Sequence, residues 1–61
     1  MIRIAICDDE KKILDEVSDY IKSYAETKTA LQFEVFPFDS VSSLISALES
    51  GRSFDIFVLD V

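Results

Sequence analysis

The sequence predicts an α/β fold in which three parallel strands alternate with two helices. Short apolar runs are separated by two stretches in which apolar residues recur with a helical period, and acids, glycine and proline mark the boundaries. Strands that alternate with helices are typical of parallel sheets with crossover connections, which are right-handed in about 98% of cases. We predict the strand order 2-1-3, because it places the proline-containing second strand at an edge.

The first strand is predicted at residues 2–7, an apolar run bounded by acids, as for a strand buried on both faces. A helix is predicted from about residue 10 to about residue 27. We expect its apolar stripe to face the core, and this stripe consists of Ile13, Leu14, Val17, Tyr20, Ile21, Tyr24 and Ala25. The polar face is expected to hold Asp15, Glu16, Ser18, Asp19, Lys22 and Ser23.

Two further strands are predicted at residues 31–38, after a turn at 27–29, and at residues 56–60. Pro37 lacks a backbone N–H, so the second strand should lie at a sheet edge or end there. The aromatic side chains are expected in the core, and they are Phe33, Phe36, Phe38, Phe54, Phe57, Tyr20 and Tyr24.

The second helix is predicted at residues 40–50, between the second and third strands. Asp39 or Ser40 can cap its start, and Gly51 can end it. The residues expected to face the core are Val41, Leu44, Ile45 and Leu48.

Length and composition limit the chain to one domain with an apolar surplus. A domain of 61 residues buries only about 60% of the surface that its unfolded chain exposes, yet 49% of the residues are apolar. We therefore expect either a fragment of a larger domain or a chain that completes its core by association.

Charge and cysteine content exclude several classes of function. A net charge of −6, no histidine and six scattered basic residues argue against nucleic-acid binding through this segment. The single cysteine, Cys7, cannot form an internal disulfide and is expected to be a core residue in a reducing compartment. Neither a signal peptide nor a membrane-spanning run is found, so we expect a soluble, cytoplasmic protein without membrane partners.

Three acids are predicted to meet at one edge of the sheet. Asp8 and Asp9 follow the first strand, and Asp60 ends the third. In the order 2-1-3 these strands lie side by side, roughly 4.8 Å apart, and flank the point at which open α/β sheets bind ligands. Clustered carboxylates are rarely tolerated without a cation, so the three acids are predicted to lie within reach of one ion.

The expected ion is Mg²⁺, which proteins usually bind through one or two carboxylates, waters and substrate phosphate. Zn²⁺ is less suited, because the chain has no histidine and one thiol. A carboxylate beside Mg²⁺ and a phosphate donor can act as a nucleophile and form an aspartyl phosphate. The cluster therefore favours phosphoryl transfer.

Two segments resemble response-regulator receiver domains, especially those of LytTR-type regulators: Ile-Ala-Ile-Cys-Asp-Asp-Glu at 4–10 and Phe-Asp-Ile-Phe-Val-Leu-Asp at 54–60. The resemblance covers residues 1–61 as the N-terminal half of the flavodoxin-like domain. It implies that Asp60 is the phosphoacceptor, that Asp9 binds Mg²⁺ directly and Asp8 through water, and that a sensor histidine kinase supplies the phosphate. The implied class is a signalling domain with at most autophosphatase activity, not an enzyme.

The resemblance also implies what these residues lack. A receiver uses a Ser or Thr after its fourth strand and a Lys after its fifth, and both would follow Val61, as would a DNA-binding output domain that regulates transcription. We therefore expect the 61 residues alone to be inactive. Lys11 and Lys12 begin a helix and are expected to be solvated rather than to replace the missing lysine.

Other interpretations remain open. Asp8 or Asp9 taken singly is more typical of a helix cap, and three further acids are expected to be turn, cap and first-turn residues, namely Asp55, Asp39 and Glu10. One alternative function is a non-catalytic module that dimerises through the open edge of the third strand or binds a kinase. A second is a Mg²⁺-dependent phosphatase with an aspartyl nucleophile, although its usual Asp-x-Asp strand end is absent here.

Overall fold

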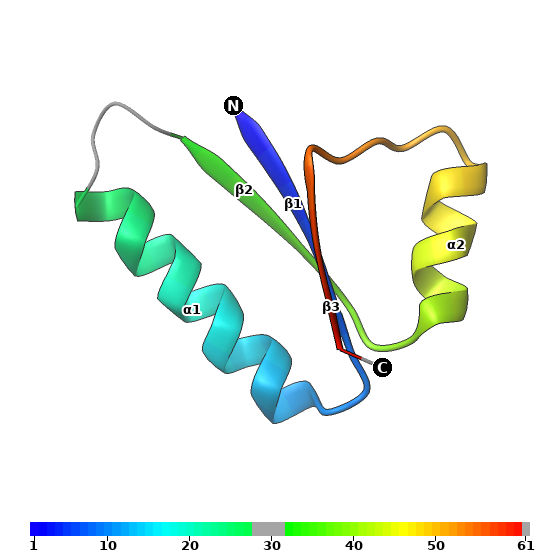
Figure 1. Ribbon diagram of the computed structural model, residues 1–61, viewed down its shortest axis with the longest axis horizontal. Helices are drawn as coiled ribbons and strands as arrows, with labels where there is room; N and C mark the ends of the chain where they lie inside the picture. The colour runs from blue at the N-terminus through cyan, green and yellow to red at the C-terminus, as the bar shows by residue number, and fades with distance from the viewer. Residues whose placement is uncertain (28–31, 61) are drawn as a thin grey trace.

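A computed structural model describes residues 1–27 and 32–60 of the chain. Strands and helices alternate as predicted (Figure 1), and the elements are β1 (Ile2–Asp8), α1 (Lys11–Thr27), β2 (Phe33–Phe38), α2 (Val41–Glu49) and β3 (Ile56–Asp60). The predicted turn residues Lys28 and Thr29, and the predicted strand residue Leu31, lie outside the described residues.

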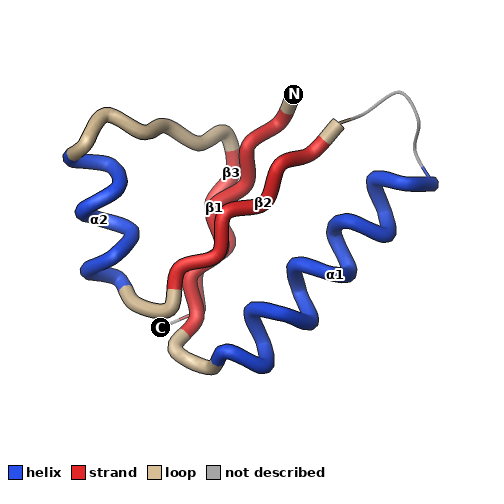
Figure 2. Tube along the Cα trace, turned by 180° about the vertical axis from the view of Figure 1, so that it is seen from behind, coloured by secondary structure: helices blue, strands red, loops and turns tan. Residues whose placement is uncertain are grey.

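The sheet has three parallel strands in the order β2-β1-β3, which confirms the predicted order. Figures 1 and 2 show α1 on one face of the sheet and α2 on the other, so the described chain forms three layers with the sheet in the middle. β1 is the central strand of that sheet. Neither of the two helices in the described residues is long and apolar enough to cross a membrane.

The side chains of β1 alternate between two cores. Ile4 and Ile6 pack with Leu14 on the α1 side, where they are joined by the partly buried Ile2, Val17, Ile21, Phe33 and Val35. The core on the α2 side consists of Ala5, Cys7, Phe38, Leu44 and Ala47, with Phe36 and Phe54 packed against it. This alternation explains why the apolar run of β1 is continuous: both of its faces are covered.

In α1, three residues differ in burial from the prediction. Ser18 is buried rather than exposed, because it follows Leu14 by four residues and precedes Ile21 by three, which places all three on one face. Its hydroxyl has no hydrogen-bond partner. Tyr20 was expected in the core but is 77% exposed, and Tyr24 is also exposed, since both lie beyond the margin of that face.

The capping residues of α2 are those that the sequence predicts, but fewer of its apolar residues are buried than predicted. Ser40 caps the helix, because its Oγ accepts the Ser43 N–H at 3.1 Å. Gly51, at φ 98°, ends the helix in a Schellman motif. Only Leu44 and Ala47 are buried, whereas three residues of the predicted stripe are exposed, namely Val41, Ile45 and Leu48.

The two edges of the sheet differ in exposure. Pro37 lies in the edge strand β2, as predicted. β3 is the other edge of the described sheet, and all five of its residues are exposed. The prediction that Phe57 belongs to the core was wrong, because no described helix packs on β3; its ring instead contacts Phe54 at 5.9 Å between centroids.

Candidate functional site

The candidate site lies where β1 and β3 end. The last residues paired between these two parallel strands are Asp8 and Asp60, which are directly opposite one another. Opposite residues in a parallel pair place their side chains on the same face of the sheet. The structure thus brings together the acid that ends the first strand and the acid that ends the third.

Asp8 has a structural task as well as a place in the site. It is 5% exposed, and its Oδ1 accepts the N–H of Glu10 at 2.8 Å. Glu10 immediately precedes α1, and its carbonyl accepts the N–H of Leu14 at 3.1 Å. Asp8 therefore stabilises the turn into α1, and this hydrogen bond fixes the orientation of its carboxylate.

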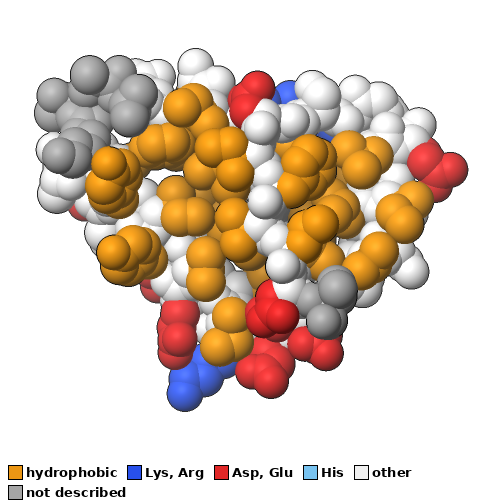
Figure 3. Space-filling view, viewed as in Figure 1, with side chains coloured by type: hydrophobic (Ala, Val, Ile, Leu, Met, Phe, Trp, Pro, Cys, Tyr) orange, Lys and Arg blue, Asp and Glu red, His pale blue; other side chains and the backbone are white. Residues whose placement is uncertain are grey.

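A hollow of about 270 Å³ lies beside this pair. Three exposed acids line it, and its complete lining is Cys7, Asp9, Asp39, Ser40, Val41 and Asp60. Figure 3 shows acidic side chains gathered at the end of the molecule where β1 and β3 end. Asp9 and Asp60, both predicted as site residues, thus share one concave surface.

Asp39 lies in the candidate site, although the sequence predicted it as a helix cap. Ser40 makes the capping hydrogen bond instead, so Asp39 remains exposed at the end of β2. The signal that could have found it is position: Asp39 directly follows β2, as Asp9 directly follows β1. The carboxyl ends of parallel strands lie at one edge of the sheet. Each of the three strands therefore has an acidic residue at or directly after its end at this edge.

Cys7 is buried and lines the same hollow as Asp9 and Asp60. Burial, followed by the negative charges of Asp8, Asp39 and Asp9, raises the pKa of the Cys7 thiol above its ordinary value. A thiol with a raised pKa is protonated at neutral pH and is a weak nucleophile and metal ligand. Cys7 is therefore a core residue, in agreement with the prediction from sequence.

The described residues do not include three His, Cys, Asp or Glu side chains gathered closely enough to hold a metal ion together. Asp8 pairs with Asp60, and Asp60 shares the hollow with Asp9, but convergence of all three on one ion stays a prediction. One or two carboxylates with several waters are what Mg²⁺ usually takes from a protein. Two of these acids would satisfy that requirement.

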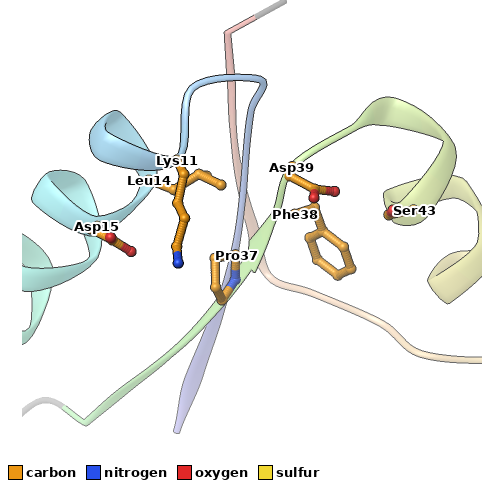
Figure 4. A pocket seen from close by; sticks show the side chains of 7 residues that line it. All are labelled: Lys11, Leu14, Asp15, Pro37, Phe38, Asp39 and Ser43. Atoms are coloured by element: carbon orange, nitrogen blue, oxygen red, sulfur yellow. The ribbon is translucent and has the colours of Figure 1, made fainter.

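A second hollow, of about 350 Å³, lies between the start of α1 and the end of β2 (Figure 4). Asp39 lines both hollows. In Figure 4, the exposed Lys11 side chain extends toward Pro37. The exposure of Lys11 agrees with the prediction that this side chain is solvated.

Asp55 has a structural role at the opposite end of β3. Its Oδ2 accepts the N–H of Arg3 at 2.8 Å, and its own N–H donates to the Arg3 carbonyl at 2.8 Å. The guanidinium groups of Arg3 and Arg52 each lie 5.0 Å from the centre of the Phe36 ring. These contacts join the start of β3 to β1 and β2, and they confirm that Asp55 is a turn residue.

The geometry therefore supports an acidic site at the carboxyl ends of the strands. A fold by itself hosts many functions, so the residues of this site are the basis for a functional assignment. In comparisons with known proteins, the chain matched no family model, no curated protein and no solved structure.

Proposed function

We propose that this chain provides the acceptor and metal-binding carboxylates of a receiver domain in two-component signalling. Asp60 is the phosphoacceptor, Asp9 is the direct Mg²⁺ ligand and Asp8 the ligand through water, with a sensor histidine kinase as the phosphate source. The proposal is supported by the resemblance of residues 4–10 and 54–60 to receivers and by the position of the three acids in the fold.

The pairing of Asp8 with Asp60 carries the proposal. The strand order β2-β1-β3 makes β1 and β3 the strands whose connections diverge, and ligands of open α/β sheets bind at the carboxyl ends of such strands. The order β1-β2-β3 would have separated the two acids by a further strand.

Each acid has the environment that its proposed role requires. Asp60 is exposed, so its carboxylate is open to a phosphate donor. Asp9 is exposed on the same hollow, whereas Asp8 is buried and held by the Glu10 N–H. In the transfer, a carboxylate oxygen of Asp60 bonds to phosphorus as the P–N bond of the phosphohistidine breaks, and the imidazole nitrogen takes the electron pair. Mg²⁺ held by these carboxylates would offset the repulsion between the two anions.

Magnesium binding tests the proposal. Titration of the 61-residue chain with Mg²⁺, followed by amide chemical shifts in NMR spectra, should show binding in the millimolar range or weaker. Asp60→Asn and Asp9→Asn should each abolish the shifts. Asp55→Asn is the matched control, because it removes the same charge from the other end of β3 and should leave Mg²⁺ binding unchanged.

Unchanged Mg²⁺ binding in both Asp60→Asn and Asp9→Asn would contradict the proposal. Equal weakening by Asp55→Asn would also contradict it, because binding would then reflect net charge rather than a site. Far-ultraviolet circular dichroism of each variant separates loss of the site from loss of the fold.

A further inference from the structure

Both arginines of the chain meet over one group of aromatic rings. Arg3 lies in β1 and Arg52 in the connection from α2 to β3, and the sequence contains no other arginine. The Cζ atom of each arginine lies 5.0 Å from the centre of the Phe36 ring and 5.5 Å from that of the Phe54 ring. The two Cζ atoms are therefore at most 10.0 Å apart, which is twice their distance to the Phe36 ring.

This arginine pair lies near the amino ends of the strands, on the α2 side of the sheet. Arg3 shares that face with Ala5 and Cys7, because side chains alternate along a strand. Phe36 packs against the same core from β2, and α2 contacts both β1 and β2. Along β1, Arg3 is about 16 Å from Asp8. The arginine pair is thus separate from the acidic candidate site.

Within the described chain, the positive charges of the pair have no partner. Neither guanidinium makes a hydrogen bond or an ion pair there. The Asp55 carboxylate accepts the backbone N–H of Arg3, and the exposed Glu34 lies opposite Arg3 in the β1–β2 ladder without pairing with it. An aromatic ring attracts a guanidinium but leaves its N–H groups available for an anion.

Both arginine side chains start from fixed backbone positions. Arg3 belongs to the ladder of β1. The N–H of Arg52 donates to the Ala47 carbonyl at 3.1 Å, in the Schellman motif that ends α2. The rings of Phe36 and Phe54, on which both guanidinium groups lie, contact each other at 5.3 Å between centroids. Groups that are held in place before a ligand arrives lose less entropy when they bind it.

We propose that Arg3 and Arg52 together bind a phosphate group. Each guanidinium presents its N–H groups as a planar fork that matches two phosphate oxygens. The two positive charges match the charge of a phosphate monoester, about −1.5 to −2 at pH 7, whereas a carboxylate has a single charge. An oxyanion bound by both forks holds their Cζ atoms roughly 8 Å apart or less. That separation is within the 10.0 Å limit set by the Phe36 ring.

This inference goes beyond the proposed function and does not rest on it. Binding of phosphate by the arginine pair requires neither Mg²⁺ nor Asp60. The phosphate group can belong to a small molecule or to a phosphorylated side chain of another protein, and the experiment below separates these two sources.

Titration of the unmodified chain with inorganic phosphate tests the proposal. The two arginines give two Nε–Hε signals in NMR spectra. In metal-free buffer, phosphate should shift both signals with one common dissociation constant in the millimolar range. Sodium chloride at the same ionic strength should cause no saturable shift. Phosphate shifts that do not saturate, or equal shifts with chloride, would overturn the proposal.

Arg52→Lys separates the shape of the guanidinium from its charge. The variant keeps the net charge but replaces the fork with a point charge, so phosphate binding should weaken at least about tenfold. Arg52 is exposed, so its replacement should not prevent folding. The control is Lys22→Gln, which removes a charge from an exposed position of α1 and should leave phosphate binding unchanged. Unchanged binding in Arg52→Lys, or equal weakening in Lys22→Gln, would refute the site.

Glu34→Gln should tighten phosphate binding about two- to fivefold, because Glu34 lies opposite Arg3 and repels an anion bound there. If the arginines only cover the aromatic rings, this substitution should not change phosphate binding, and that result would contradict the proposal.

A short phosphoserine peptide, titrated in the same way, identifies the source of the phosphate group. Peptide binding at least about tenfold tighter than that of inorganic phosphate assigns the group to a phosphorylated protein. Equal binding assigns it to a small molecule. Either result supports the site, whereas failure of both ligands to bind would refute it.

Discussion

The two edges of the sheet are built from strands of similar length but are stabilised in different ways. β2 contributes Phe33 and Val35 to the core on the α1 side, and Phe36 and Phe38 to the core on the α2 side. Among the described residues, β3 belongs to neither core and is attached through its backbone ladder to β1 and through the ring contact of Phe57.

Position at an edge does not by itself determine how firmly a strand is held. β2 is an edge strand that both helices cover and that Pro37 protects, whereas β3 is an edge strand that neither helix covers. Asp60, the proposed phosphoacceptor, lies on the less firmly held strand. Its place opposite Asp8 is therefore maintained mainly by the β1–β3 hydrogen bonds.

The largest effect is expected from Ile6→Ala, because Ile6 lies in the strand on which both edges depend. Ile6 is 2% exposed, and its truncation should lower the free energy of unfolding by about 2–5 kcal/mol in urea denaturation. Ile45→Ala, at a residue 49% exposed, is the control and should cost less than about 1 kcal/mol. Equal losses at the two sites would contradict the assignment of the core.

Removing the protection of β2 should make the two edges alike. The double substitution Glu34→Val with Pro37→Val restores an outward N–H and removes an exposed charge. An unprotected edge strand can pair with other chains, so light scattering should detect particles that grow with concentration. Glu16→Val, which removes the same charge from α1, should not produce them. Failure of the double variant to grow would show that the protection lies elsewhere.

Hydrogen exchange can compare the two ladders directly. The amide of Val58 should exchange at least about tenfold faster than that of Phe36, which corresponds to about 1.4 kcal/mol. Both amides are directed toward β1, but only Phe36 belongs to a strand packed in the cores. Similar protection of the two amides would argue against a weaker β3.

Ser18→Ala should stabilise the core that holds β2 by about 1 kcal/mol, because it removes a buried hydroxyl without a hydrogen-bond partner. Part of the gain comes from the higher helix propensity of alanine. Ser23→Ala at an exposed position of α1 measures that part alone and should give the smaller increase. A loss of stability in Ser18→Ala would indicate that the hydroxyl is paired in solution.

The smallest effect is expected from the pH dependence due to Cys7, which lies opposite Leu59 of β3. The pKa of this thiol is raised in the folded chain, so the unfolded chain loses the proton first as the pH rises through about 8.5. The free energy of unfolding should therefore fall above that pH, and Cys7→Ala should remove this part of the fall. Identical pH profiles for the two proteins would contradict the raised pKa.

Much of the fold could be predicted from local patterns. Three predictions depended only on neighbouring residues, and the structure confirms them: the strand at the apolar run of β1, the helix cap at Ser40 and the helix end at Gly51. The faces of the helices were harder to predict. Ser18 and Tyr20 were assigned by residue type, whereas burial depends on which side of α1 contacts the sheet.

In the candidate site, too, some features could be predicted from local sequence and others depended on tertiary contacts. The sequence by itself determined that acids follow β1 and end β3, and that Pro37 suits an edge. Only the tertiary structure decided that Asp8 lies opposite Asp60, that Asp39 shares a hollow with Asp9, and that neither described helix covers β3. The physical reason is range: turns, caps and strand ends depend on neighbouring residues, whereas register and burial depend on segments that meet only when the sheet has formed.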